Sequence, residues 1–597
     1  MTAATEARPG PVEPQPGRAA RVGHAIRNVQ GRTIAIFGIV LVLVWLVLGP
    51  VVMLVTSSFR ATEGRLPISP GVEWTLDNYI AVLTNPTTWT VMWNTLLFAI
   101  GALVLSFALS IAFAWLIERT DLPFRGVLFV VIIASIGLPN VISGIAYALL
   151  LNPSNGLINI ALRALLGMDA NASGPLNAYT LPGMIFVQGI TLVPITYLLV
   201  AAAFRAMDTA MEDAGSTSGA SYGTVMRRIT LPLLTPALLA ALVYQFVTVI
   251  ESFDIPLVLG LRGGVPVLST TVFVETQPSG GLPNYGLASA YAILLLVAAI
   301  VPLLIYNRVL GRGDRYATIT GHSYLPRRIR LGAWKVPALV LSLAFIFVSF
   351  VLPALVMLWT SLQPFYAVPS AESIARISLD AYGEVFSAPR LQRALVNTMI
   401  LGVSAGIGAM VLGLLVSWIL VRTRSGLRFV LDVLAFTPHA MPGVLIGLSI
   451  LLIYLILPLP VYGTIWILVI ALGTQYISIA TRLMSGGIAQ IKVELEEAGA
   501  VSGASWGLVI RRIVLPLVLP AFLNGFLLVF LLSIKNLTLA LILFTPESIV
   551  MSTLVWNYWD IGADTAETAV VGMIMVVITL TLSIIVRRLN RETAQLT

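Results

Sequence analysis

The chain has 597 residues, of which 58% are hydrophobic and 10% are charged, and its mean hydropathy is +0.94. Soluble domains carry roughly 25% charged residues, so this composition excludes an ordinary soluble fold and predicts a protein solvated by lipid. The sequence contains no cysteine and only three histidines, which excludes disulfide frameworks, thiol catalysis and Cys/His metal sites.

The first 32 residues are polar and basic and are expected to be disordered. The apolar run after them is too long for a signal peptide and lacks an A-x-A cleavage pattern, so we interpret it as a retained first span. Twelve apolar stretches are long enough to cross a hydrocarbon core of roughly 30 Å. They are predicted at 33–58, 93–117, 126–151, 178–204, 231–255, 285–307, 336–362, 395–421, 429–457, 464–481, 515–543 and 567–586.

The basic residues divide unequally between the two sets of loops. The tails and the loops on one side hold 27 of the 35 Lys and Arg residues, the opposite loops hold 7, and Lys535 lies within a span. The positive-inside rule therefore predicts that both termini are cytoplasmic. Because this topology accounts for the net charge of +8, no nucleic-acid partner is expected.

One polar segment occurs twice in this apolar chain. Residues 212–236 and 496–520 are identical at 16 of 25 positions, at a constant offset of 284. The repeat continues upstream at an offset of 303, where Trp115 and Arg119 match Trp418 and Arg422. The difference of 19 residues is an insertion between the third and fourth spans. Its sequence NPSNGLINIALRALLGMD predicts a short amphipathic helix on the outer face.

A duplication on this scale predicts two homologous six-span halves. The predicted organisation is a cytoplasmic tail (1–32), a first half (33–310), a basic cytoplasmic linker (311–334), a second half (335–588) and a short cytoplasmic tail (589–597). Since six crossings return the chain to its starting side, the halves should be related by a pseudo-twofold axis along the membrane normal. The predicted fold class is an all-α polytopic membrane protein with about 12 transmembrane helices.

The duplicated segment follows one spacing in both copies. The first copy reads Asp213-Ala214-Gly215-x3-Gly219-x9-Ile229-x-Leu231-Pro232, and the second reads Glu497-Ala498-Gly499-x3-Gly503-x9-Ile513-x-Leu515-Pro516. This resembles the EAA loop of bacterial ABC-importer permeases, E-A-A-x3-G-x9-I-x-L-P, with Asp for Glu in the first copy and Gly at the third position in both. The resemblance covers essentially the whole chain.

The resemblance implies the type I importer fold, with each EAA loop (about 207–232 and about 491–516) forming a coupling helix that inserts into a groove on a cytoplasmic ATPase subunit. The residues assigned to ATPase coupling are Glu212, Asp213, Ala214, Gly215, Gly219, Glu496, Glu497, Ala498, Gly499 and Gly503.

An ordinary juxtamembrane amphipathic loop is the alternative interpretation of this segment. Its acidic residues would keep a short helix out of the lipid, and Gly219 and Gly503 permit a sharp turn after it. Pro232 and Pro516 stand at the start of the next span, where a missing N–H costs nothing. Since an ordinary loop would not preserve the spacing twice, we prefer the docking role.

The sequence contains no G-x4-G-K-[ST] phosphate loop and no cytoplasmic stretch long enough for a nucleotide domain. The chain is therefore expected to be a permease without an ATPase site of its own, and not an enzyme. The resemblance implies two copies of a cytoplasmic ABC ATPase that uses ATP and Mg, an extracytoplasmic solute-binding protein, and membrane lipid as partners in a bacterial inner membrane. No cofactor or metal is expected to bind this chain.

Two ionisable residues occupy equivalent positions in the predicted membrane region. Glu251 and Lys535 are related by the 284-residue offset, and intramembrane charges are candidates for function. They could pair or flank a solute path, and an outer-end salt bridge or snorkelling side chains are the alternative. Prolines are expected to break the third and ninth spans, and broken spans often line a pathway. The substrate-path candidates are Glu251, Asp254, Lys535, Asn536, Pro139 and Pro442.

Three short runs resemble fused permeases of the ferric-iron transporter type: Glu251-Ser252-Phe253-Asp254-Ile255-Pro256, Lys535-Asn536-Leu537 and Asn155-Gly156-Leu157-Ile158-Asn159. That group commonly carries Lys-Glu-Leu-Pro where this chain has Lys-Asn-Leu-Thr. Related fused permeases are linked to thiamine, polyamines and phosphonates. The expected solute is therefore ferric iron or another small ion or metabolite.

His439, beside Pro438 and Pro442, has two interpretations. It is either a ligand or pH switch, or a packing residue at a helix break. We prefer packing, because the chain offers no Cys partner and the first half has Gly-Leu-Pro at the matching place.

The leading hypothesis for the whole chain is the fused permease of a binding-protein-dependent ABC importer. The main alternative is a twelve-span secondary transporter driven by an ion gradient, which would leave the paired cytoplasmic motif unexplained. A scaffold or channel has no positive feature in its favour.

Overall fold

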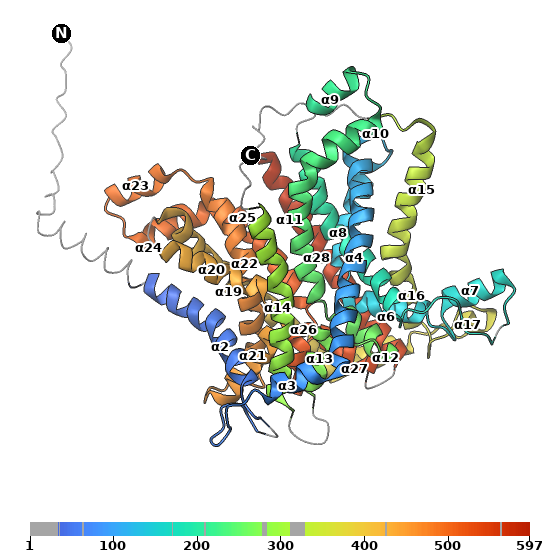
Figure 1. The fold of residues 1–597 in the computed structure, drawn as a ribbon, viewed down its shortest axis with the longest axis horizontal. Helices are drawn as coiled ribbons and strands as arrows, with labels where there is room; N and C mark the ends of the chain where they lie inside the picture. The colour runs from blue at the N-terminus through green and yellow to red at the C-terminus, as the bar shows by residue number, and fades with distance from the viewer. Residues whose placement is uncertain are drawn as a thin grey trace, which may run out of the picture.

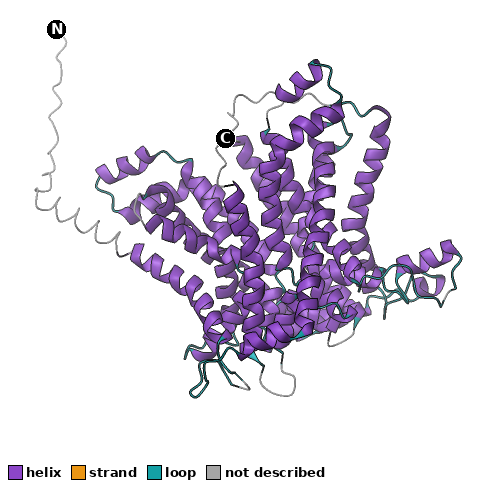
Figure 2. Cartoon of the chain, viewed as in Figure 1, coloured by secondary structure: helices purple, strands orange, loops and turns teal. Residues whose placement is uncertain are grey.

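The computed structural model describes residues 34–596, except 35, 63–64, 170, 208–209, 278–282, 311–328, 424–426 and 561–563. The predicted N-terminal tail and most of the predicted linker lie outside the described residues. Helices build the described part, which contains no strand and only two isolated β-bridges (Figure 2). The all-α prediction is confirmed.

Ten helices in the described part are long and apolar enough to cross a membrane, and three bent helix pairs raise the number to as many as 13. Twelve of these candidates coincide with the predicted spans. In the first half they are Ile36–Ser58 (which ends in α2, Gly49–Ser58), α4 (Pro86–Arg119), α5 (Arg125–Ala134) with α6 (Asn140–Leu150), α8 (Leu181–Ala206), α11 (Leu231–Ile250) and α14 (Tyr285–Leu310). In the second half they are α15 (Lys335–Ile346) with α16 (Leu352–Ser361), α19 (Pro389–Arg422), α20 (Leu427–Ala440) with α21 (Gly443–Ile456), α22 (Ile465–Ala489), α25 (Leu515–Ile534) and α28 (Thr565–Leu596).

Four of these spans contain a five-residue π-helical turn, and each turn is separated by one residue from a following proline. Proline has no N–H to donate and its ring clashes with the preceding turn, which accounts for the wider turn. The pairs are Val44–Leu48 with Pro50, Met226–Thr230 with Pro232, Phe347–Val351 with Pro353, and Ile510–Val514 with Pro516. The two halves therefore share local distortions as well as spans.

The third and ninth spans are broken, as their prolines predict. The angle between α5 and α6 is 96°, and that between α20 and α21 is 105°. Pro139 and Pro442 are the N-caps of α6 and α21, with extended ψ angles of 139° and 137°. Proline favours this polyproline-like backbone, so it ends one helix and starts the next in a new direction.

The loops that the sequence predicts on the outer side hold more helix than expected. The prediction of one span over 515–543 is wrong, because α25 ends at Ile534 and the chain turns before the short helix α26 (Thr538–Ile542). The polar pair Lys535-Asn536 interrupts an apolar run there without lowering its average hydropathy enough to end the predicted span. The loops predicted at 256–284 and 544–566 contain α12 (Leu261–Gly263), α13 (Leu268–Glu275) and α27 (Met551–Asp560). The segments Pro256–Gly263 and Leu268–Glu275 form the third bent pair, at 82°.

The first span of each half packs on the other half. α2 packs on α14 of its own half and on α21 of the second half, and α16 packs correspondingly on α28 and on α6. The Tyr147 hydroxyl donates to the Val348 carbonyl at 2.6 Å, and the Tyr366 hydroxyl donates to the Leu149 carbonyl at 2.8 Å. These contacts between the first span of one half and the helices of the other half join the two halves into one bundle.

The duplicated segments lie at one end of the bundle. Figure 1 shows α9 (Ala210–Thr217) and α23 (Val493–Val501) at the same end and on different sides of the molecule. The short helices α3 (Asp77–Thr84), α13 and α27 lie at the opposite end. The helix predicted within the insertion is confirmed as α7 (Leu157–Leu166), which projects sideways near that opposite end (Figure 1).

The start of the second half is fixed to the turn between α4 and α5. The backbones of Thr120 and Ile329 form an isolated parallel bridge. Asp121 accepts a hydrogen bond from the Leu331 N–H at 2.9 Å and forms an ion pair of 2.8 Å with Lys335. These partners lower the pKa of the Asp121 carboxyl below its ordinary value. Polar contacts at the end of α4 therefore hold the segment that leads into the second half.

Candidate functional site

Each duplicated segment folds as a short helix, a glycine turn and a second helical stretch. In the first copy α9 precedes α10 (Tyr222–Val225), and in the second α23 precedes α24 (Trp506–Val509). Gly219 and Gly503 follow the first helix with φ angles of +81° and +82°. This left-handed region costs glycine little and other residues more, so the predicted sharp turn is confirmed in both copies.

The glycine at the third motif position marks a close contact. A Cβ atom on Gly215 would lie 2.9 Å from Cδ1 of Ile229, and one on Gly499 would lie 2.8 Å from Cδ1 of Ile513. Both isoleucines belong to the motif itself, so the short helix folds back on the stretch that leads into the next span. The departure from alanine at this position therefore has a packing cause in both halves.

Glu496 points into the protein. Its Oε1 accepts a hydrogen bond from Arg422 Nε at 2.7 Å, and its Oε2 accepts one from Trp418 Nε1 at 2.9 Å. Arg422 also donates through Nη2 to the carbonyls of Ile488 and Ile491, at 3.2 Å and 2.7 Å. Glu496 thereby ties α23 to the ends of α19 and α22.

Glu212 takes the equivalent position on α9 with different partners. Its Oε1 accepts a hydrogen bond from Thr230 Oγ1 at 2.7 Å, while its Oε2 lies 4.0 Å from Arg119 Nη1. Arg119 donates through Nη2 to the Phe204 carbonyl at 3.1 Å, and its buried Nε makes no hydrogen bond in the structure. The first anchor thus includes a hydroxyl donor beside a more distant guanidinium group, and the second includes a guanidinium group that donates at 2.7 Å.

The neighbouring acidic residues face outward. Asp213 and Glu497 are exposed, as are Ala214 and Ala498. The sequence assigned both Glu212 and Asp213 to ATPase coupling, and in the structure Glu212 is partly buried whereas Asp213 is exposed. One acid of each pair holds the helix to its span, and the other is available to a partner.

The anchoring residues on α4 and α19 were missed as functional candidates. The sequence identified Trp115, Arg119, Trp418 and Arg422 only as markers of the repeat. A tryptophan and an arginine four residues apart lie on one helix face, and both pairs stand at the end of an apolar span that enters water. A tryptophan–arginine pair at the end of a span, present in both halves, was the sequence signal that could have identified these residues.

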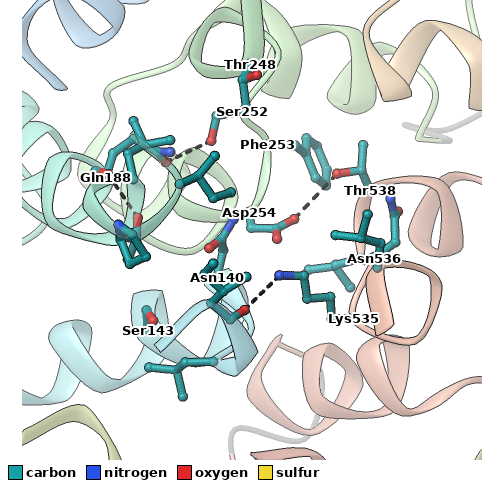
Figure 3. Close-up of a pocket in the computed structure, with 18 of the residues that line it drawn as sticks. Asn140, Ser143, Gln188, Thr248, Ser252, Phe253, Asp254, Lys535, Asn536 and Thr538 are labelled. Atoms are coloured by element: carbon teal, nitrogen blue, oxygen red, sulfur yellow. Dashed lines mark hydrogen bonds between the residues drawn. The ribbon is translucent and has the colours of Figure 1, made fainter. Parts of the chain in front are cut away.

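A polar cavity of about 210 Å³ lies between the two halves (Figure 3). It is bordered by the break between α5 and α6, by α8, by the ends of α11 and α25, and by the starts of α21 and α26. Four of the six predicted substrate-path residues line it: Glu251, Asp254, Lys535 and Asn536. Pro139 and Pro442 do not line it themselves, but their neighbours Leu138, Asn140 and Gly443 do.

Glu251 and Lys535 are equivalent in structure as well as in sequence. They are the C-caps of α11 and α25, and both are half-buried at the cavity. Lys535 Nζ donates to the Ile136 carbonyl at 2.9 Å. Among the described residues, no ion pair within 4.0 Å includes Lys535. The two charges therefore flank the cavity without pairing.

Neutral polar groups complete the cavity wall. Asn536 Nδ2 lies 3.3 Å from Gln475 Oε1 and 3.2 Å from the Tyr476 hydroxyl. Ser252 Oγ donates to Gln188 Oε1 at 2.8 Å. The first half thus supplies the carboxylates of the cavity, and the second half supplies its ammonium group.

His439 packs between the halves. Its ring stacks on that of Tyr244 with centroids 4.9 Å apart, and it lies 5.7 Å from the Phe436 ring. In the part of the chain that the structure describes, no group of three or more His, Cys, Asp or Glu residues could hold a metal ion. The packing interpretation of His439 agrees with these contacts.

Two six-span halves, each with a short motif helix at the same end, define the class: a duplicated polytopic transport permease. The family model described as "Binding-protein-dependent transport system inner membrane component" matches twice, over residues 110–313 and 409–595. The chain belongs to this family, which confirms the resemblance to ABC-importer permeases.

Relatives with different transport names match the chain. The ferric transport system permease protein FbpB of Actinobacillus pleuropneumoniae is 26% identical over 344 residues, which cover 55% of this chain and 47% of that protein. The trehalose/maltose transport system permease protein MalF of Thermococcus litoralis is 30% identical over 275 residues, which cover 46% of this chain and 90% of that protein. A solved bacterial ABC transporter involved in alginate import matches with a TM-score of 0.34 and 17% identity, over 44% of this chain and 96% of that chain. The chain spans about half the length of the ferric-transport relatives that it matches first.

Proposed function

We propose that this chain is the permease of a binding-protein-dependent ABC importer in a bacterial inner membrane. Two separate cytoplasmic ATPase subunits, which use ATP and Mg, would each engage one motif helix, α9 or α23. A small solute, ferric iron or another small ion or metabolite, would pass between the halves after delivery by an extracytoplasmic binding protein. The observation that carries the proposal is the pair of outward-facing acids, Asp213 and Glu497, on helices that are anchored to spans at one end of the bundle.

The contacts offer a route from the ATPase to the cavity. Glu496 fixes α23 to α19 through Arg422, and α19 packs along α22 and α25. The last residues of α25 lead directly to Lys535 at the cavity wall. A displacement of α23 would therefore reach the cavity through packed helices, without a flexible segment between them.

The orientation follows from charge. The basic loops predict that the end bearing α9 and α23 is cytoplasmic, with both termini on that side. The opposite end, with α3, α13 and α27 (Figure 1), would then receive the binding protein. The outward-facing surface of the spans between these ends would contact membrane lipid.

The proposal covers a broad class of solutes. The relatives' names include ferric iron and sugars, and the described residues hold no three-ligand metal cluster. The cavity volume of about 210 Å³ favours a small solute. Passage of ferric iron would therefore rely on groups other than a resident metal site of His or carboxylate ligands.

An ion-coupled secondary transporter is the second candidate. The observation that favours it is the presence of Glu251, Asp254 and Lys535 in one central cavity, since carriers use such groups for coupling. It gives no role to the exposed acids on α9 and α23.

Reconstitution separates the two candidates. The purified chain would be placed in liposomes with and without the ATPase encoded beside it, together with the binding protein. We expect uptake only with ATPase and ATP. Uptake by the chain alone, driven by a proton or sodium gradient, would instead establish the secondary transporter.

Charge reversal tests the docking role. Asp213→Lys combined with Glu497→Lys should abolish copurification of the ATPase and lower ATP-driven uptake at least about tenfold, because about 1.4 kcal/mol of lost binding already gives that factor. The matched control is Glu73→Lys with Glu384→Lys, which reverses one exposed acid in each half at the opposite end and should leave copurification unchanged. Full ATPase binding by the first double variant would contradict the docking role.

A further inference from the structure

The central cavity is lined by charged groups of opposite sign that come from different halves of the chain. Figure 3 shows Asp254 and Lys535 approaching the cavity from different segments of the chain. Asp254, like Glu251, belongs to the first half, whereas Lys535 belongs to the second half at the position equivalent to Glu251. The duplication has thus produced a cavity with an acidic side and a basic side.

These charged groups are incompletely paired with protein atoms. An ammonium group has three donors, and Lys535 Nζ uses one of them on the Ile136 carbonyl. The Asp254 carboxylate accepts one long hydrogen bond, 3.5 Å from Thr538 Oγ1. Glu251 stands at the C-terminus of α11, where it lines the cavity together with Gly443. Each group therefore keeps hydrogen-bonding capacity toward the cavity.

Charges held away from bulk water are costly unless they are paired and hydrogen-bonded. In the structure Lys535 meets neither carboxylate within ion-pair distance. A molecule between the walls that carries both charge signs would complete both sets of contacts at once. A dianion would face two carboxylates, and a dication would face Lys535.

We propose that the cavity binds a small zwitterionic solute, with its ammonium group toward Asp254 and Glu251 and its acid group toward Lys535. The inference rests on the proposed transport function and names the solute class for it. The amides and hydroxyls of Asn140, Ser143, Gln188 and Gln475 supply neutral hydrogen bonds between the charged walls. The volume of about 210 Å³ accommodates a molecule of a few carbon atoms.

A charge series of matched length tests the proposal by direct binding. The full chain in lipid nanodiscs, without ATP, would be titrated by calorimetry with 4-aminobutanoate, 1,4-diaminobutane and butanedioate. We expect 4-aminobutanoate to bind at least about tenfold more tightly than either of the others, which is a difference in binding free energy of about 1.4 kcal/mol. Equal affinities, no measurable binding of any probe at millimolar concentration, or a preference for the dication or the dianion would overturn the proposal.

Single substitutions test which charged residue contacts each end of the solute. Lys535→Met should weaken zwitterion binding about 30-fold and remove the penalty on the dication, while Asp254→Asn should weaken the zwitterion by a similar factor and favour the dianion. Lys335→Met, which removes an ammonium group that pairs with Asp121 and does not line the cavity, is the control and should leave the order of affinities unchanged. Correct folding of each variant is checked by its elution as a single species.

The acid group can be a carboxylate or a phosphonate, and 3-aminopropylphosphonate in place of 4-aminobutanoate distinguishes them by relative affinity. ATP-driven uptake that persists unchanged in both Lys535→Met and Asp254→Asn would overturn the zwitterion site and leave the importer function standing. Failure of ATP-driven uptake in the unmodified chain would instead count against the importer.

Discussion

In the contact that holds α23 to its span, the arginine donates to the carboxylate at 2.7 Å, whereas in the contact that holds α9 the arginine lies 4.0 Å away and a threonine hydroxyl donates to the carboxylate. Glu496 and Arg422 each have about 10% of their side-chain surface exposed, and their closest atoms are 2.7 Å apart. Glu212 is 20% exposed and lies 4.0 Å from Arg119. Two segments with the same spacing and the same acidic, tryptophan and arginine residues thus differ in how firmly the acid is engaged.

One position differs between the two anchors in a way that bears on this distance. Thr230 in the first half is equivalent to Val514 in the second, by the 284-residue offset. The Thr230 hydroxyl takes one oxygen of Glu212, while Val514 is fully buried and has no group to donate. Glu496 therefore turns both oxygens to Arg422 and Trp418. The edge-on contact of the Trp418 and Trp506 rings, at 5.2 Å, adds to this second anchor.

The largest expected effect comes from neutralising the anchoring acids. Glu496→Gln leaves Arg422 partly buried without its counter-charge, and removal of one member of such a pair costs about 3 kcal/mol. Glu212→Gln also removes a counter-charge, that of Arg119, but because these two groups are already 4.0 Å apart we expect a smaller loss, of about 1 kcal/mol. Hydrogen exchange of the peptides that cover 493–501 and 210–217 should report these losses as unequal falls in the free energy of local opening.

The exposed neighbour supplies the control for this comparison. Glu497→Gln removes the same charge one residue further along α23 and should leave exchange there nearly unchanged, because that side chain is exposed. Equal losses in Glu496→Gln and Glu212→Gln would show that the two anchors are equivalent in solution.

Much of this architecture followed from the sequence. Apolar run length identified twelve spans, Pro139 and Pro442 identified the two breaks, and the repeat offset paired Glu251 with Lys535. These features depend on local chemistry or on the comparison of one half with the other. They can therefore be predicted from the sequence without knowledge of tertiary contacts.

Other features depend on contacts between distant segments. Adjacent residues on a helix point about 100° apart, but the sequence alone did not indicate whether Glu496 or Glu497 would face the protein. That choice is set by Arg422, which lies 74 residues away in the chain. The position of Lys535 Nζ likewise depends on a distant segment, since it donates to the Ile136 carbonyl of the other half.

An intermediate effect is expected when the hydroxyl is removed. Thr230→Val should lower the free energy of local opening of α9 by about 1 kcal/mol, since a partly buried carboxylate oxygen loses one donor. In a double-mutant cycle with Glu212→Gln, the two changes should show a coupling energy of about 1 kcal/mol. The same cycle between Val514→Ala and Glu496→Gln should show little coupling. Additive effects in the first cycle would mean that the Thr230 hydroxyl is not the cause of the difference between the two anchors.

The smallest effect is expected at the third motif position, where the two halves should behave alike. Gly215→Ala places a Cβ atom 2.9 Å from an isoleucine Cδ1 atom, and Gly499→Ala places one at 2.8 Å. In both cases the Cδ1 atom is the far end of a flexible side chain. Repacking of that end costs about 1 kcal/mol, and replacing a helical glycine by alanine returns about 1 kcal/mol. The local opening free energies of α9 and α23 should therefore change by less than about 0.5 kcal/mol, and by the same amount in both. A clear loss in only one half would mean that the helices also differ in their contact with the following turn, and that the carboxylate anchors are not the sole source of the asymmetry.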